Sequence, residues 1–147
     1  MKPQKLPFKQ FLDSFKFVPR IGVNLFITNK NNKILLTKRA KDPFKDHWHF
    51  PGGFLLKGEK LEDCVKRIAK DELNLSLNTS KLELAGVFEN LDSDPRGHIL
   101  DIFYKFRIAN AAFPESFADS KEIKFFDKVP QDIGFNHLEY LKHFGYS

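Results

Sequence analysis

The segment PGGFLLKGE at residues 51–59, followed by Arg67 and then by Asp71 and Glu72, decides the fold of this chain. Two adjacent glycines favour a tight turn, because glycine adopts backbone conformations that other residues avoid. From Glu59 onward apolar residues recur at helical spacing, which predicts a helix of about four turns. A glycine turn that leads into a helix with acidic residues is typical of a site that holds a divalent cation against a diphosphate.

Strands are predicted on both sides of this segment. Residues 29–32, Asn-Lys-Asn-Asn, are typical of a hairpin turn between the first two strands. The predicted strands are residues 21–28, 33–39, 82–88, 98–108 and 123–126. A final helix is predicted at residues 138–144, with Asn136 and Glu139 as a capping pair at its start. This order of strands and helices predicts an α/β sandwich.

The chain of 147 residues is predicted to form one domain, residues 1–147. Within it, residues 1–18 carry apolar side chains at helical intervals, which predicts a short amphipathic helix or an extended arm packed on the body. Cys64 is the only cysteine, so a disulfide framework is excluded.

Composition and charge limit the class of partner. No run approaches about 18 consecutive apolar residues, which excludes a membrane-spanning helix, and the first residues lack the apolar core of a signal peptide, so we expect a cytoplasmic protein. The formal net charge of +5 favours acidic partners, such as a nucleoside diphosphate or a nucleic acid. Long runs of Lys and Arg and zinc-binding spacing are missing, so a dedicated nucleic-acid-binding protein is disfavoured.

The glycine turn and the residues after it resemble the Nudix box, the motif of a family of hydrolases. Two positions depart from the family pattern. Ile68 stands where the family has a metal-binding glutamate, and an alkyl side chain cannot coordinate a cation. Asn74 stands where the family has a glycine, which is a smaller change because asparagine tolerates the left-handed conformation that ends many helices. The matching positions are Gly53, Glu59, Arg67, Ala69, Asp71, Glu72 and Leu75.

This resemblance implies an α/β/α sandwich with a mixed sheet, and an enzyme that hydrolyses a nucleoside diphosphate linked to a sugar or another group with Mg²⁺ or Mn²⁺ as cofactor. The nearest subfamily is that of the GDP-mannose mannosyl hydrolases, whose box also lacks the glutamate after the arginine. A GDP-mannose-like substrate and a homodimer are expected from this likeness. In that subfamily a histidine of a late loop acts as the base. Residues 117–122 contain no histidine here, which leaves Asp119 or Glu122 as base, or an attack of water on phosphorus.

The resemblance and the spacing together suggest a set of site residues. The expected metal ligands are a backbone carbonyl at Gly53 and the carboxylates of Glu59 and Glu72, and we expect one cation because Ile68 supplies no carboxylate. The planar guanidinium of Arg39 suits a phosphate group. The candidate catalytic residues are Arg39, Glu59, Asp71, Glu72 and Glu122, and the candidate substrate-binding residues are Arg39, Phe50 and His98.

Alternatives stay open for several of these residues. Glu59 and Arg67 also fit a structural ion pair, and Asp71 fits a solvated surface charge. A second hypothesis is a Nudix-fold binding module that has lost catalysis and recognises a nucleotide metabolite or a protein. Ile68, Asn74 and the missing histidine of the late loop favour this hypothesis.

Overall fold

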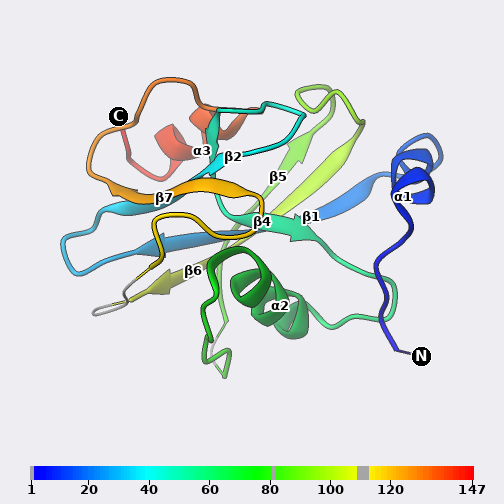
Figure 1. Cartoon of the computed structure of the whole chain (residues 1–147), viewed down its shortest axis with the longest axis horizontal. Coiled ribbons are helices and arrows are strands. Elements are labelled where there is room, and N and C mark those ends of the chain that lie inside the picture. Colours follow the sequence, from blue (N-terminus) through cyan, green and yellow to red (C-terminus); the bar gives the residue numbers. More distant parts are fainter. Residues whose placement is uncertain (1, 81, 109–112) are drawn as a thin grey trace.

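The structure is a computed structural model that describes residues 2–80, 82–108 and 113–147 (Figure 1). No helix within these ranges is long and apolar enough to cross a lipid bilayer. In chain order the elements are α1 (Phe8–Ser14), β1 (Arg20–Thr28), β2 (Ile34–Arg39), β3 (Trp48–His49), β4 (Gly52–Phe54), α2 (Leu61–Leu73), β5 (Glu83–Asn90), β6 (Ile99–Arg107), β7 (Ser120–Phe126) and α3 (His137–His143).

The sheet is organised around β1. β1 and β6 run parallel along their whole length, from the pair Arg20 and Ile99 to the pair Thr28 and Arg107. β5 pairs antiparallel with β6, and β4 pairs antiparallel with β1 near its start. β2 pairs antiparallel with β3 and β7 and meets β1 at the hairpin, where Thr28 lies opposite Ile34. One parallel pair among antiparallel pairs makes the sheet mixed, as the sequence predicted.

Helices cover both faces of this sheet. Alternate residues of β1 point to opposite faces, so Val23, Leu25 and Ile27 pack with α2, whereas Phe26 packs with α3. Figure 1 shows α2 and α3 on opposite sides of the strands. The predicted α/β/α sandwich is therefore confirmed.

Helix α2 forms because its apolar face and both of its ends favour a helix. Its buried residues are Cys64, Val65, Ile68, Ala69 and Leu73. Glu62 and Asp63 in the first turn and Lys70 in the last turn match the direction of the helix dipole. Asn74 ends the helix in the left-handed conformation, with φ of 51° and ψ of 37°, which confirms the prediction made for this residue.

The predicted capping pair of the last helix is wrong. The side chain of Asn136 makes no capping hydrogen bond. Its Nδ2 donates instead to the hydroxyl of Tyr140 at 2.8 Å, and its Oδ1 accepts from Nδ2 of Asn90 at 3.2 Å. A partner from a distant strand competes with the local cap, and a local sequence pattern contains no sign of such a partner. The N-terminal segment does form the short helix, α1, that was one of its two predicted conformations.

Truncation of Ile68 tests the packing of α2 on the sheet. Ile68 is 1% exposed and lies beneath Gly53, where an added Cβ would be 3.1 Å from its Cγ1. We expect Ile68→Ala to lower the free energy of unfolding by about 2–5 kcal/mol, because it removes buried methyl groups and leaves a cavity, and Ile68→Val to lower it by about 0.5–1.5 kcal/mol. Urea denaturation measures both. A loss no larger than that of Lys66→Ala, an exposed position of the same helix, would contradict this packing.

Candidate active site

A cleft of about 270 Å³ opens where β1, β2 and β4 meet the surrounding loops. Its walls come from elements that are far apart in the sequence. Among the polar residues on these walls are Asn24, Arg39, His49, Glu72, Asn90, Asp94, Arg96, Asp101, Asp119, Ser120 and His137. Acidic and basic groups therefore face the same small space.

The two glycines of the box, Gly52 and Gly53, line this cleft as part of strand β4, so the tight turn predicted at these residues is wrong, because pairing with β1 extends the backbone there. Gly52 pairs with Asn24 of β1, and Gly53 pairs with Val23. An added Cβ at Gly52 would collide with the amide of Asn24 and lie 2.9 Å from the carbonyl oxygen of Val23, while one at Gly53 would press on Ile68. Both positions need glycine because the backbone packs this closely on β1 and α2.

Glu59 and Arg67 form an ion pair that joins the loop after the glycines to α2. Arg67 donates from Nε to Oε2 of Glu59 at 2.8 Å, and from Nη2 to the carbonyl oxygen of Phe54 at 2.8 Å. Burial raises the pKa of Glu59, but hydrogen bonds from Arg67 and from the amide of Leu56 outweigh that effect and hold the pKa below its usual value. The structural ion pair is confirmed. Because the Glu59 side chain is 4% exposed and does not line the cleft, it is not available to a cation there.

Glu72 is the acid of α2 that faces the cleft. Burial raises the pKa of Glu72, and the negative charge of Asp119 raises it further. Asp119 lies in the loop before β7, lines the same cleft and forms an ion pair with Lys41 at 3.1 Å. Two carboxylates from separate elements thus face one space, an arrangement that a bound cation stabilises.

Asp71 and Glu122, two other predicted catalytic acids, lie outside the cleft. Asp71 is exposed and forms an ion pair with Lys5 at 3.3 Å. Glu122 lies on β7 and pairs with Lys38 of β2 at 3.2 Å. From the sequence, Glu122 was a candidate catalytic residue and Asp119 only one of two possible bases, but it is Asp119 that lines the cleft.

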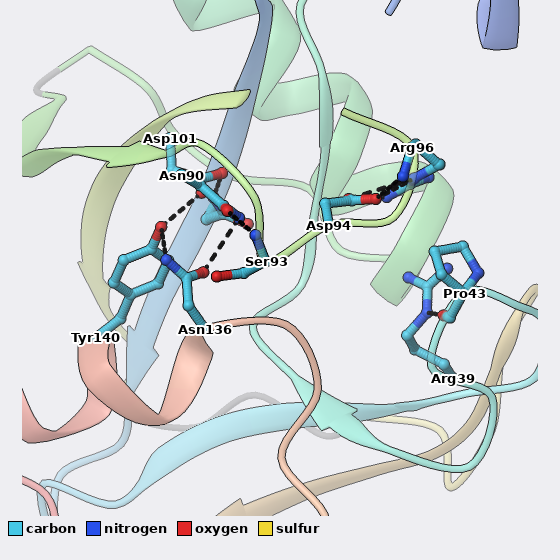
Figure 2. A network of polar contacts seen from close by, with 10 residues as sticks. Arg39, Pro43, Asn90, Ser93, Asp94, Arg96, Asp101, Asn136 and Tyr140 are labelled. Atoms are coloured by element: carbon cyan, nitrogen blue, oxygen red, sulfur yellow. Dashed lines mark hydrogen bonds and ion pairs between the residues drawn. The ribbon is translucent and has the colours of Figure 1, made fainter. Parts of the chain in front are cut away.

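Two arginines also line the cleft (Figure 2). Arg39 donates from Nε to the carbonyl oxygen of Pro43 at 2.5 Å, and Arg96 donates from Nε and Nη2 to the carboxylate of Asp94 at 3.0 and 2.7 Å. Burial lowers the pKa of Arg39, and the positive charge of Arg96 lowers it further, so the two guanidinium groups are near enough to repel. Arg39 was a candidate from the sequence. Arg96 and Asp94 were missed, because residues 90–97 read only as a polar turn.

Phe50 and His98, the remaining predicted substrate-binding residues, are not on the cleft walls. Phe50 is fully buried in the core, and its amide donates to Nδ1 of His137 at 3.1 Å. Its ring packs against those of Phe26, Phe103 and Phe144, which leaves it unavailable to a substrate. His98 precedes β6, and its carbonyl oxygen accepts from the amide of Arg20 at 3.0 Å.

His49 and His137 line the cleft and stack on each other with ring centres 5.9 Å apart. Burial lowers the pKa of both rings, and the charge of Arg39 lowers it further, so the pKa of His137 is about 3. Both histidines are therefore neutral at neutral pH. Since Nδ1 of His137 accepts from the amide of Phe50, its proton lies on Nε2.

Asp101 lies at the centre of a buried hydrogen-bond network (Figure 2). Its Oδ1 accepts from Nδ2 of Asn24 at 2.9 Å, and its Oδ2 accepts from the hydroxyl of Tyr140 at 2.7 Å. Tyr140 also accepts from Asn136, which is bonded to Asn90. Burial raises the pKa of Asp101, and the bonds from Tyr140 and Asn24 oppose that rise. The network ties β1, β5, β6 and α3 into one wall of the cleft.

Glu72 and Asp119 are the residues that fit a divalent cation. Within residues 2–80, 82–108 and 113–147, no group of three His, Cys, Asp or Glu side chains is arranged to hold a metal ion. Magnesium often takes only one or two protein carboxylates and completes its shell with water and substrate phosphate. Burial is the main cause of the raised pKa of Glu72, and the negative charge of Asp119 adds to it, as expected when a second carboxylate faces the same space. Glu72 and Asp119 therefore fit a cation whose remaining ligands come from water and from the phosphates of a substrate.

Comparisons with known proteins agree with this arrangement. A family model described as NUDIX domain matches residues 18–132. The ADP-ribose pyrophosphatase of Methanocaldococcus jannaschii is 37% identical over 128 residues, which cover 86% of this chain and 73% of that protein. A solved MutT/nudix family protein from Enterococcus faecalis has a TM-score of 0.74 at 24% identity, over 92% of this chain and 67% of that one. The NUDIX domain of Shewanella oneidensis NrtR, solved with ADP ribose, has a TM-score of 0.71 at 21% identity, over 93% of this chain and 96% of that domain. The two structures show a common fold.

The neutral state of His137 predicts a loss of stability in mild acid. Its pKa of about 3 when folded lies below the ordinary 6.5, so the unfolded chain binds more protons and folding is disfavoured as the pH falls below 6.5. The loss is about 1.4 kcal/mol per pH unit for one such group.

His137→Asn removes the titrating ring and keeps an acceptor for the amide of Phe50. Urea denaturation at about pH 7 and about pH 5 should show that the wild type loses roughly 2 kcal/mol more than His137→Asn between the two conditions. His49 and the carboxylates are common to both proteins and cancel in this comparison. Equal losses in the two proteins would rule out a neutral, buried His137.

Proposed function

The chain belongs to the NUDIX family of hydrolases, and on that basis we propose that it hydrolyses a nucleoside diphosphate linked to a sugar with the help of Mg²⁺, with ADP-ribose as the first substrate to test. The observation that carries the proposal is the meeting of Glu72 and Asp119 with Arg39 in one cleft beside the two glycines of the box. Carboxylates suit the cation and an arginine suits the phosphates.

The size of the site supports a substrate larger than a mononucleotide. A groove of about 560 Å³ adjoins the cleft, and both are lined by Phe11, Gly53, Phe54 and Glu72. The groove runs between the N-terminal segment and α2, and is rich in apolar side chains such as Leu6 and Leu55. The cleft suits the diphosphate and the groove suits one of the two groups attached to it.

Attack at phosphorus fits the described residues better than attack at the sugar carbon. The cation, when bound, supplies a Lewis acid that polarises a phosphate oxygen. Glu72 binds it from α2, and Asp119 orients a water molecule and accepts its proton. The water oxygen bonds to one phosphorus while the bridging P–O bond breaks, which yields a nucleoside monophosphate and a sugar phosphate. Arg39 stabilises the charge that develops on the phosphate oxygens.

The likeness to GDP-mannose mannosyl hydrolases stays a prediction, and GDP-mannose is a second substrate to test. The likeness is supported by Ile68, which stands where the family has a glutamate. It is weakened by the late loop, residues 117–122, which carries no histidine that would serve attack at carbon. A relative that is 37% identical over 86% of this chain is instead an ADP-ribose pyrophosphatase. We therefore favour ADP-ribose.

Replacement of the α2 acid tests the enzyme directly. We expect Glu72→Gln to lower kcat/KM for ADP-ribose with Mg²⁺ by at least about 100-fold, equivalent to about 2.7 kcal/mol, because the amide binds the cation poorly. Chromatography should detect AMP and ribose 5-phosphate from ADP-ribose, and GMP and mannose 1-phosphate from any GDP-mannose that is turned over. Glu62→Gln, an exposed acid on the same helix, should be as active as the wild type. Release of GDP with free mannose would contradict attack at phosphorus.

A binding module that has lost catalysis is the second candidate function. It is favoured by Ile68, which is committed to the core, and by the lack of a three-ligand metal group in the part of the chain that the structure describes. Such a module would bind nucleotides without turnover.

Calorimetry separates the two candidates through the effect of the cation on affinity. For the enzyme, Mg²⁺ should tighten ADP-ribose binding by at least about tenfold, since Glu72 and the phosphates would hold the cation together, and Glu72→Gln should lose this gain. For this titration a slowly hydrolysed phosphonate analogue of ADP-ribose replaces the substrate. Binding that is equal with and without Mg²⁺, together with no turnover, would establish the module.

A further inference from the structure

We infer that Arg39 and Arg96, positioned by the ring of Phe135, form a clamp that binds a phosphate group without a metal ion. The inference rests on the proposed function in one respect, since the phosphate group belongs to the same substrate. Arg96 and Phe135 carry the new part of it, because neither residue stands out in the sequence.

Phe135 is a platform shared by both guanidinium groups. The guanidinium carbon of Arg39 lies 5.1 Å from the centre of the Phe135 ring, and that of Arg96 lies 5.8 Å from it. The face of an aromatic ring attracts a cation at distances up to about 6 Å. Two cations that repel each other are thus held against one ring.

The backbone beneath this platform is strained. Phe135 has a φ of 55°, and Phe44, whose ring centre lies 4.7 Å from that of Phe135, has a φ of 59°. This left-handed region is unfavourable for a bulky residue, because its Cβ approaches the following carbonyl oxygen. Strain of this kind persists where the surrounding structure holds it, and it is concentrated at binding sites.

Each arginine keeps N–H groups for a ligand. Arg39 uses Nε on the carbonyl of Pro43, and Arg96 uses Nε and Nη2 on Asp94. Every buried side-chain nitrogen or oxygen in the described residues has a partner, so the remaining Nη groups are open to solvent, and both arginines line the cleft. The Asp94 side chain is 1% exposed and holds Arg96 in one orientation.

Arg39 and Arg96 bring two positive charges to this corner of the cleft. Asp94 is paired with Arg96, while burial and then the charge of Arg96 lower the pKa of Arg39, and Asp94, Glu72 and Asp119 oppose that change. A phosphate group matches the planar guanidinium fork and is held more strongly than by neutral donors. The clamp also suits a chain with Ile68 in the box, because fewer carboxylates hold fewer cations and the substrate phosphates need neutralisation from another source.

Titration calorimetry with inorganic pyrophosphate in the presence of EDTA tests the clamp. The wild type should bind, and Arg96→Gln and Arg39→Gln should each weaken binding by at least about tenfold, because each removes one charged fork. Arg107→Gln is the matched control, since this arginine is exposed at the end of β6 and should leave the affinity unchanged.

Two substitutions of Phe135, one without and one with an aromatic ring, test its role. Phe135→Leu should weaken pyrophosphate binding by about threefold to tenfold, whereas Phe135→Tyr should bind as the wild type does because it keeps the ring. Phe17→Leu, at an exposed phenylalanine of the same protein, should have no effect. Circular dichroism checks the fold of each variant. If Arg96→Gln does not fold, Arg39→Gln and Arg96→Lys decide the question.

Two results would overturn the clamp: a wild type that fails to bind pyrophosphate once EDTA removes cations, and an Arg96 variant that binds as well as the wild type. Glu72→Gln separates this inference from the proposed function. It should abolish hydrolysis and leave pyrophosphate binding in EDTA intact. A wild type that binds pyrophosphate in EDTA but hydrolyses none of the substrates would refute the proposed enzyme and leave the clamp standing.

Discussion

The hydrogen bonds of Arg67 are the interaction on which the site depends. One guanidinium group holds the carboxylate of Glu59 and the carbonyl of Phe54, and so fastens both ends of the loop after β4 to helix α2. Without this pair the loop would gain conformational freedom and lose its polar link to the helix. With it, β4 stays packed between β1 and α2, and Glu72, just over one turn further along α2, takes a fixed place at the cleft.

The substitution at position 68 changes how charge is distributed in the site. An isoleucine here fills the space beneath Gly53 and strengthens the core at the expense of a carboxylate. The remaining acids come from two elements, α2 and the loop that carries Asp119. Positive charge comes from Arg39 and from Arg96, which the structure brings next to it. A cleft in which Glu72 and Asp119 face two arginines suits a polyphosphate with a single cation better than a set of several metal ions.

Much of the fold could be predicted because its signals are local. The hairpin turn at residues 29–32, the apolar period of α2 and the left-handed Asn74 each depend on a few neighbouring residues. The pair of Glu59 and Arg67 was also among the predicted alternatives, since both belong to one motif. The capping role of Asn136 was wrong because its partner, Asn90, lies 46 positions away.

The sequence alone determined the family, the layered fold and the presence of Glu72 and Arg39 in the site, because these follow from spacing within one continuous segment and the strand before it. Only the tertiary structure placed Asp119 rather than Glu122 at the cleft, Phe50 in the core, and Arg96 beside Arg39 on the ring of Phe135. These outcomes depend on which distant loops meet at the cleft. Such contacts are set by the packing of whole elements, which no short spacing in the chain encodes.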